Sequence, residues 1–320
     1  RGLGDVYKRQ GIYIMDDISP IRELAKKDLS IDQLLPTQSA YRFQMLQAMK
    51  SDGSSLINGR NPSYGANIDF YLSDENKKSI FIEIKNKDLE VVRTLNVKKF
   101  TKGVNRIMWD LRYEPTTVPK LRVNPDGVDW VKYNSDGWRP LRTWDLDVNA
   151  GKLGPLAVPG QYSVTLKIDG KEYSNKFEVL KDPNTIGTLT DINDQFQFLF
   201  TLRNTINETV DLINKIENIR FDLQNNERSS RSKKLERELY RIESNLFDTK
   251  LTGAREDAFR NPNKIYGRLA ALGSDLTRFG SDFKPTDQQV EVYNVLSNRL
   301  IEQKKDFDKV MKNEFWYSEK

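Results

Sequence analysis

The chain has 320 residues, 30% charged and 37% hydrophobic, and this length allows two globular domains that each bury a core. It contains neither Cys nor His, which excludes imidazole bases, Ser-His and Cys-His nucleophile pairs and the usual zinc ligands, so we expect no cofactor. The net charge is only +5 and no apolar run reaches the length of a membrane span, so we expect neither nucleic acid nor a bilayer as partner.

The first ten residues, RGLGDVYKRQ, are hydrophilic and lack the apolar stretch of a secretory signal. Residues 5–10 resemble the literal translation of a sequencing-library transposon adapter. We therefore expect residues 1–10 to be an assembly artefact, with native sequence beginning at Gly11 inside a larger protein. The next stretch, GIYIMDD, predicts a buried strand whose partners lie upstream. A short helix around residues 21–25 and a linker as far as residue 60 are expected to follow.

The region from about residue 64 to residue 182 alternates apolar and polar side chains, which is typical of half-buried strands. The alternation is clear in ANIDFYL, SIFIEIK, EVVRTL and GVNRIMWDL. In QYSVTLKIDGKEYSNKFEV, Asp169-Gly170 predicts the two-residue turn of a hairpin, because both positions tolerate positive φ. Six or seven such strands predict an antiparallel immunoglobulin-like β-sandwich over residues 61–183.

The last part of the chain changes to the 3.6-residue period of amphipathic helices, beginning with one long helix. A second helix is predicted at about residues 232–249, and Asn261-Pro262 is typical of the start of a third. Thr286 and Gln289 form a capping box that opens the last helix. We therefore expect an antiparallel helical bundle over residues 188–316, and an α+β multidomain protein as a whole.

Five motifs occur in a recognisable order: GIYIMDDISPI, VNRIMWDLRYEP, GPLAVPGQYSVTLKIDGK, NPNKIYGRLAAL and KPTDQQVEVYNVLSNRL. Together they resemble the C-terminal region of large bacterial sortilin-like, neuraminidase-repeat β-propeller proteins, often labelled glycosyl hydrolases. The sandwich is also similar to the immunoglobulin-like module of hook-capping and secretion-tail proteins at Val92, Trp109-Asp110 and residues 159–162. The resemblance implies that GIYIMDD is the last propeller strand and that the protein is secreted, periplasmic or on the cell surface.

A long loop, residues 112–155, interrupts the sandwich pattern, and long loops in compact domains tend to be functional or docked. Its candidate ligand-binding residues are Trp130, Tyr133, Trp138, Arg139 and Trp144. Aromatic rings can stack on sugars, and Asp129, Asp136 and Asp145 can accept hydrogen bonds from hydroxyl groups. Alternatively the loop folds back and seals the sandwich against the helices or the upstream propeller. We favour this alternative, because three exposed Trp side chains would form a costly apolar patch.

These observations favour a non-catalytic structural and interaction module that packs on the propeller of the same protein. The alternative is a fragment of a carbohydrate-active hydrolase whose Trp-rich loop contributes to a glycan-binding cleft. A cell-surface protein is a third kind of partner. No pair of carboxylates can be assigned to one site from the sequence, so no catalytic residue is predicted.

Overall fold

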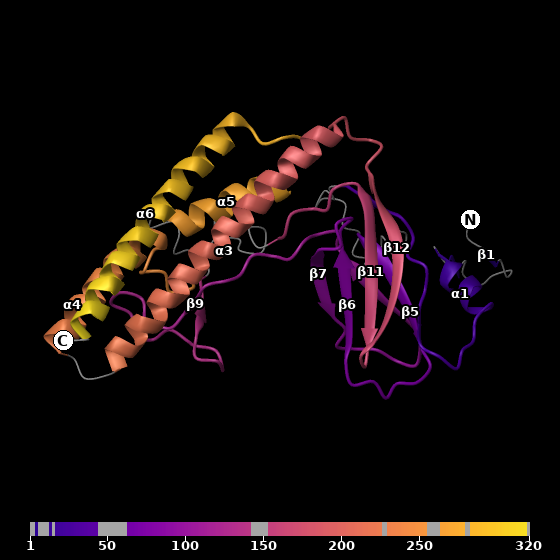
Figure 1. Cartoon of the computed structure of the whole chain (residues 1–320), viewed down its shortest axis with the longest axis horizontal. Helices are drawn as coiled ribbons and strands as arrows, with labels where there is room; N and C mark the ends of the chain where they lie inside the picture. The colour runs from indigo at the N-terminus through magenta and orange to yellow at the C-terminus, as the bar shows by residue number, and fades with distance from the viewer. Residues whose placement is uncertain are drawn as a thin grey trace. The chain divides into compact units, whose positions relative to one another are not determined.

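The structure is a computed structural model that describes residues 4–5, 13–14, 17–43, 63–141, 153–225, 229–254, 263–278 and 282–318. The chain divides into two compact units. The β unit comprises residues up to Glu114 together with Leu156–Asn184, and the helical unit comprises Pro115–Pro155 together with Thr185–Lys320. The predicted α+β organisation, with the β region before the helices, is confirmed (Figure 1).

The larger sheet of the β unit has the strand order β4-β12-β11-β6-β7. Its strands are β4 (Ala40–Arg42), β12 (Lys171–Lys181), β11 (Gly160–Ile168), β6 (Ile80–Lys85) and β7 (Val91–Asn96). All neighbours are antiparallel except β4 and β12, which are parallel. Asp169 and Gly170 both have positive φ and join β11 to β12, so the predicted hairpin is confirmed.

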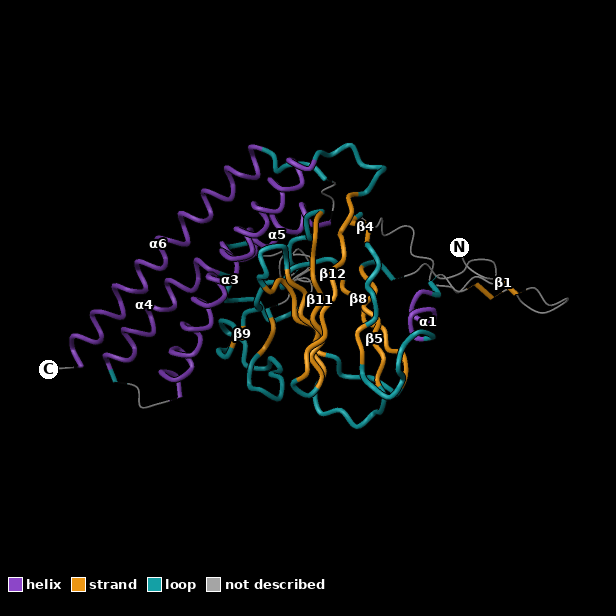
Figure 2. Tube along the Cα trace, turned by 45° about the vertical axis from the view of Figure 1, so that its right-hand side comes forward, coloured by secondary structure: helices purple, strands orange, loops and turns teal. Residues whose placement is uncertain are grey.

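The smaller sheet has the order β3-β5-β8, formed by Gln33–Leu34, Ala66–Leu72 and Gly103–Trp109 (Figure 2, orange). The Trp109 side chain is fully buried, and its ring centroid lies 5.5 Å from that of Tyr162 and 5.9 Å from that of Phe177 in the larger sheet. Its Nε1 donates to the backbone oxygen of Arg112 at 2.8 Å. The two sheets therefore bury their apolar faces against each other around Trp109.

The N-terminal segments differ from the prediction. In GIYIMDD the described residues contain β2 (Tyr13–Ile14), which pairs with β1 (Gly4–Asp5) in the segment predicted to be an adapter and not with a strand upstream of it. The predicted short helix is present as α1 (Ser19–Leu24). The segment expected to be a linker also supplies β3 and β4, which give one strand to each sheet. These strands are too short to produce a recognisable alternation in the sequence.

The helical unit contains four long helices among its described residues: α3 (Leu189–Asn225), α4 (Ser230–Leu246), α5 (Ile265–Arg278) and α6 (Asp287–Ser318). Both α3 and α6 contact α4 and α5, and Figure 1 shows α3, α5 and α6 running alongside one another. The apolar stripe of α3 faces the shared core, as its period predicts.

The helix starts agree with their sequence signals where the structure describes them. Gln289 Oε1 accepts from Thr286 N at 2.9 Å and Gln289 N donates to Thr286 Oγ1 at 3.2 Å, which confirms the capping box of α6. Ser229 Oγ caps α4 by accepting from Ser232 N at 3.0 Å. Asn261-Pro262 lies outside the described residues. No helix within the described ranges is both long and apolar enough to cross a membrane.

Substitution of Gly65 tests the junction between β5 and β8. Gly65 has φ +130°, and a Cβ atom there would lie 2.0 Å from the backbone oxygen of Trp109. Gly103 at the start of β8 also has positive φ, but no atom lies within 4 Å of the position that a Cβ would take there. We expect Gly65→Ala to lower the free energy of unfolding of the β unit by more than about 3 kcal/mol, and Gly103→Ala by only about 1–2 kcal/mol.

Urea unfolding of the two variants, with hydrogen exchange of β5 and β8 amides to assign the transition, gives both values. Equal losses for the two variants would contradict the predicted close approach of Gly65 to Trp109.

Candidate functional site

Residues 115–141 of the long loop belong to the helical unit, whereas residues 112–114 belong to the β unit. Leu121 and Leu141 lie in the hydrophobic core formed by the helices. Strands β9 (Lys120–Leu121) and β10 (Arg139–Pro140) pair antiparallel and close residues 122–138 into a hairpin-like excursion, here called the aromatic loop. The base of the aromatic loop is therefore fixed on the helices.

Polar side chains on one face of α3 hold the backbone that enters this loop. Asn207 Oδ1 accepts from Thr117 N at 2.8 Å, and Asn214 Oδ1 accepts from Lys120 N at 2.8 Å. Glu217 Oε2 accepts from the backbone N–H groups of Arg122 at 2.6 Å and Val123 at 2.8 Å. The three acceptors follow one another at intervals of seven and three residues, so they lie on the same side of the helix. They satisfy N–H groups of an irregular segment that has few strand partners.

Arg139 was a candidate ligand-binding residue, but its side chain is only 3% exposed. Its Nε donates to the backbone oxygen of Val123 at 3.1 Å, and its Nη1 donates to that of Leu251 at 2.7 Å. Burial lowers the pKa of Arg139, while the nearby Glu217 carboxyl opposes this shift. Arg139 thus ties the two ends of the aromatic loop to the segment that follows α4.

The aromatic candidates differ from one another in their surroundings. Trp130 is 69% exposed, so its side chain does not seal a joint within the helical unit. Tyr133 is partly exposed, and its hydroxyl donates to Asn124 Oδ1 at 2.6 Å. Trp138 is half-buried, and its backbone N–H donates to Asn134 Oδ1 at 3.1 Å. Trp144 lies outside the described residues.

The acidic candidates in the loop are exposed where they are described. Asp129 and Asp136 both face solvent, and Asp145 lies outside the described residues. Asp126 was not singled out from the sequence, yet its Oδ2 accepts from Tyr240 Oη at 2.7 Å and from Thr249 Oγ1 at 2.8 Å. These bonds fix another point of the loop on α4 and on the segment that follows it.

A cluster of buried charges lies beneath the loop base, and the sequence analysis missed it. Glu217, Arg220 and Glu243 are 1%, 5% and 0% exposed. The guanidinium of Arg220 donates to Glu243 Oε2 and, at 3.0 Å, to Glu236 Oε1, and it lies 5.0 Å from the Tyr240 ring centroid. Glu217 and Arg220 occupy positions at which the apolar stripe of α3 continues. Charged residues in an apolar stripe were the signal in the sequence that could have revealed this cluster.

Burial perturbs the protonation of both carboxyl groups in this cluster. Desolvation raises the pKa of Glu243 well above the ordinary glutamate value of 4.5, and the proximity of Glu217 raises it further. Desolvation also raises the pKa of Glu217, although the N–H groups of Arg122 and Val123 oppose the shift. Perturbed carboxyl groups with defined charged partners mark a functional-site candidate.

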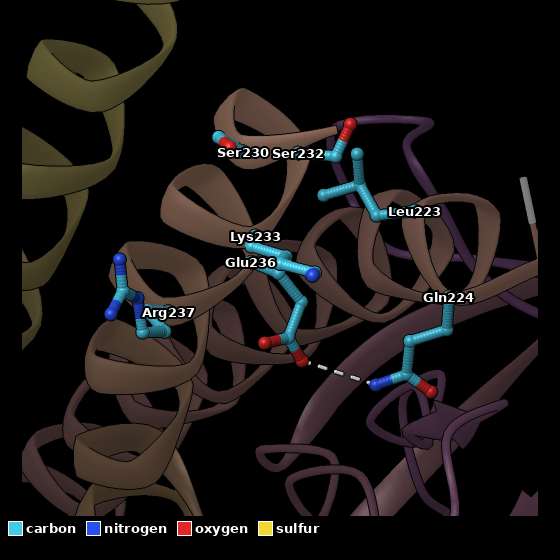
Figure 3. A pocket seen from close by; sticks show the side chains of 7 residues that line it. All are labelled: Leu223, Gln224, Ser230, Ser232, Lys233, Glu236 and Arg237. Atoms are coloured by element: carbon cyan, nitrogen blue, oxygen red, sulfur yellow. Dashed lines mark hydrogen bonds between the residues drawn. The ribbon is translucent and has the colours of Figure 1, made fainter. Parts of the chain in front are cut away.

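A pocket of about 540 Å³ opens beside this cluster, near the end of α3 and the start of α4. Its walls include Leu223, Gln224, Lys233, Glu236 and Arg237 (Figure 3). Figure 3 shows the Glu236 carboxylate directed at Gln224, whose Nε2 donates to Glu236 Oε1 at 3.1 Å. Because Glu236 also accepts from Arg220, it connects the pocket wall to the buried cluster.

No group of three or more acidic side chains in the described part of the chain has an arrangement that could hold a metal ion. Comparisons with protein-family models, curated proteins and solved structures find no match for this chain.

Two substitutions in the loop separate its anchor from its exposed tip. We expect Arg139→Ala to lower the free energy of unfolding of the helical unit by about 3–5 kcal/mol, because it removes a buried charge that compensates Glu217. Trp130→Ala is expected to change it by less than about 0.5 kcal/mol, because the side chain is largely exposed. Denaturant unfolding measures both values, and a comparable loss for Trp130→Ala would show that its ring is packed.

Proposed function

We propose that this chain is a non-catalytic structural and interaction module, the C-terminal region of a sortilin-like, neuraminidase-repeat β-propeller protein that is secreted, periplasmic or on the cell surface. The order of its five motifs supports this proposal. Its partner is the upstream propeller of the same protein, which the exposed tip of the aromatic loop contacts.

The strand order supports an immunoglobulin-like assignment of the β unit within this proposal. In their order across the sheets, β12-β11-β6-β7 correspond to the G-F-C-C′ sheet of that fold, and β3-β5-β8 correspond to strands of the opposite A-B-E sheet. Tyr162 lies near the start of the F-like strand, and its hydroxyl donates to the backbone oxygen of Val158 four residues upstream at 3.0 Å. This is the geometry of a tyrosine corner. The chain departs from antibody domains in having no Cys, and its core Trp109 lies on β8.

One observation carries the proposed interaction: an anchored loop exposes a large aromatic side chain. Side chains of α3 and the Arg139 guanidinium hold the loop base, whereas Trp130 at the tip remains 69% exposed. A rigid base reduces the conformational entropy that binding would cost. Trp is also among the residues that contribute most binding free energy when an interface buries them. The loop therefore has the properties of a docking element for a protein surface.

Hydroxyl-radical footprinting of a chain extended upstream tests this contact. We expect oxidation of Trp130 in the 320-residue chain and at least about tenfold slower oxidation when the upstream domain is present, because the contact buries the ring. Trp109, which is fully buried in the β unit, serves as the unchanged reference. Equal oxidation of Trp130 in both chains would contradict docking through this residue.

Glycan binding is the second candidate function, and the exposure of Trp130 and Tyr133 favours it. Asp129 and Asp136 are exposed on the same loop and can accept hydrogen bonds from sugar hydroxyl groups. Saturable quenching of Trp fluorescence by an oligosaccharide, lost in Trp130→Ala, would support this function instead of docking.

A cell-surface protein is the third kind of partner. A cell-surface protein that protects Trp130 from oxidation without any upstream domain would support it.

Hydrolytic assays distinguish a binding module from an enzyme fragment. We expect no turnover of a panel of aryl glycosides, because the buried carboxyl groups of Glu217 and Glu243 are engaged in holding the fold. Turnover that Asp129→Asn or Asp136→Asn abolishes would overturn the non-catalytic proposal.

A further inference from the structure

Glu217 and Glu243 are both buried in the core of the helical unit, and a hydrogen bond with the Glu217 carboxyl group is among the causes that raise the pKa of Glu243. Two ionised carboxylates cannot form such a bond, because neither has a proton to donate. Among the described residues, no other donor reaches Glu243 Oε1, and that atom is buried. A proton on Glu243 would satisfy this oxygen and give Glu217 another donor. An unsatisfied buried carboxylate oxygen would otherwise be costly.

Carboxyl groups outnumber guanidinium groups in the buried cluster, which favours a proton on one of the carboxyl groups. Arg139 and Arg220 interact with Glu217, Glu236 and Glu243, so two guanidinium groups face three carboxyl groups. Within the cluster, α3 provides Glu217 and Arg220, α4 provides Glu236 and Glu243, and β10 provides Arg139. Tyr133 lies near Arg139, and Tyr240 lies against Arg220. Within the described residues, none of the charged groups that act most strongly on the pair comes from α5 or α6.

We propose that Glu217 and Glu243 share one proton at neutral pH and form a pH-sensitive anchor that holds the aromatic loop on α3 and releases its base when the proton is lost. The anchor acts through the Glu217 carboxylate, which accepts the N–H groups of Arg122 and Val123. A second negative charge on Glu243 repels Glu217 in a site where water cannot screen it. This inference rests on the proposed function, since the loop that the pair anchors is the proposed docking element.

The sign of the pH dependence follows from the direction of both shifts. Folding raises the pKa of Glu217 and of Glu243 above the ordinary value of 4.5, so folding favours the protonated forms. The stabilising contribution of the pair is complete below pH 4.5 and is lost as the pH rises through the raised pKa values of the folded chain. The two titrations are coupled, so they belong to the pair and not to one residue. Alkaline conditions therefore loosen the loop base.

Hydrogen exchange at the backbone amides of Arg122 and Val123 tests the anchor. The exchange rates are expressed as protection factors, because this removes the intrinsic effect of pH on exchange. In the wild-type chain we expect both protection factors to fall by about tenfold or more between neutral pH and about pH 10. In Glu243→Gln, whose amide is neutral at every pH and can donate to Glu217, they are expected to stay constant. Oxidation of the half-buried Trp138 should increase with pH in the wild type alone.

Two further variants test the charge balance. Glu236→Gln removes one negative charge from the cluster, so we expect the fall in protection to occur at lower pH. Glu238→Gln is the matched control, because Glu238 is a partly exposed α4 residue that pairs with Arg241 outside the cluster. It is expected to leave the pH dependence unchanged.

Carbon-13 resonances of labelled Glu carboxyl groups provide a measurement on the wild-type chain, which remains informative if Glu243→Gln does not fold. One carboxyl resonance is expected to remain in its protonated position at neutral pH. Its absence would overturn the shared proton, and pH-independent protection of Arg122 and Val123 would overturn the anchor. If the protection factors of Arg122 and Val123 fall with pH while the oxidation of Trp138 stays unchanged, the proposed effect on the aromatic loop would be overturned. None of these readouts needs a partner, so their failure is distinct from an unprotected Trp130 in the extended chain.

Discussion

Backbone N–H groups that leave water must find acceptors, and this constraint determines how the long loop is built. Residues 115–123 form only a two-residue ladder, between β9 and β10, so side chains of α3 provide most of the remaining acceptors. An Asn amide oxygen accepts one N–H group, whereas one Glu217 oxygen accepts two. Glu217 thereby brings a negative charge into the core, and the guanidinium groups of Arg139 and Arg220 compensate it.

The sequence predicts the parts of the fold that are long enough to show a period. Strands β5, β6, β8 and the β11–β12 hairpin alternate over six or more residues, and α3 and α6 have several turns of apolar stripe. In contrast, β3 and β4 are two and three residues long, and their pairing is determined by strands far away in the sequence. Local periodicity contains no information about such tertiary pairing.

The candidate site is less predictable, because residue type alone suggested which side chains contact a ligand. Arg139 lies beside aromatic residues in the sequence, but its hydrogen bonds go to Val123 and to Leu251, which is 112 residues away. Glu217 and Glu243 lie on different helices, so their proximity cannot be deduced before the helices are packed. Trp130 and Tyr133 were candidates because they are aromatic residues of the loop, but their exposure depends on how the loop base is held.

The polypeptide passes between the two units three times, at residues 114/115, 155/156 and 184/185. A ribosome releases residues 115–141 before it releases β11 and β12, and α3 emerges only after both strands. During synthesis, the N–H groups of Thr117, Lys120 and Val123 therefore remain hydrated while the β unit obtains its last strands. The loop can reach all of these acceptors only when residue 217 has left the exit tunnel, so its docking is completed late in the biogenesis of this chain.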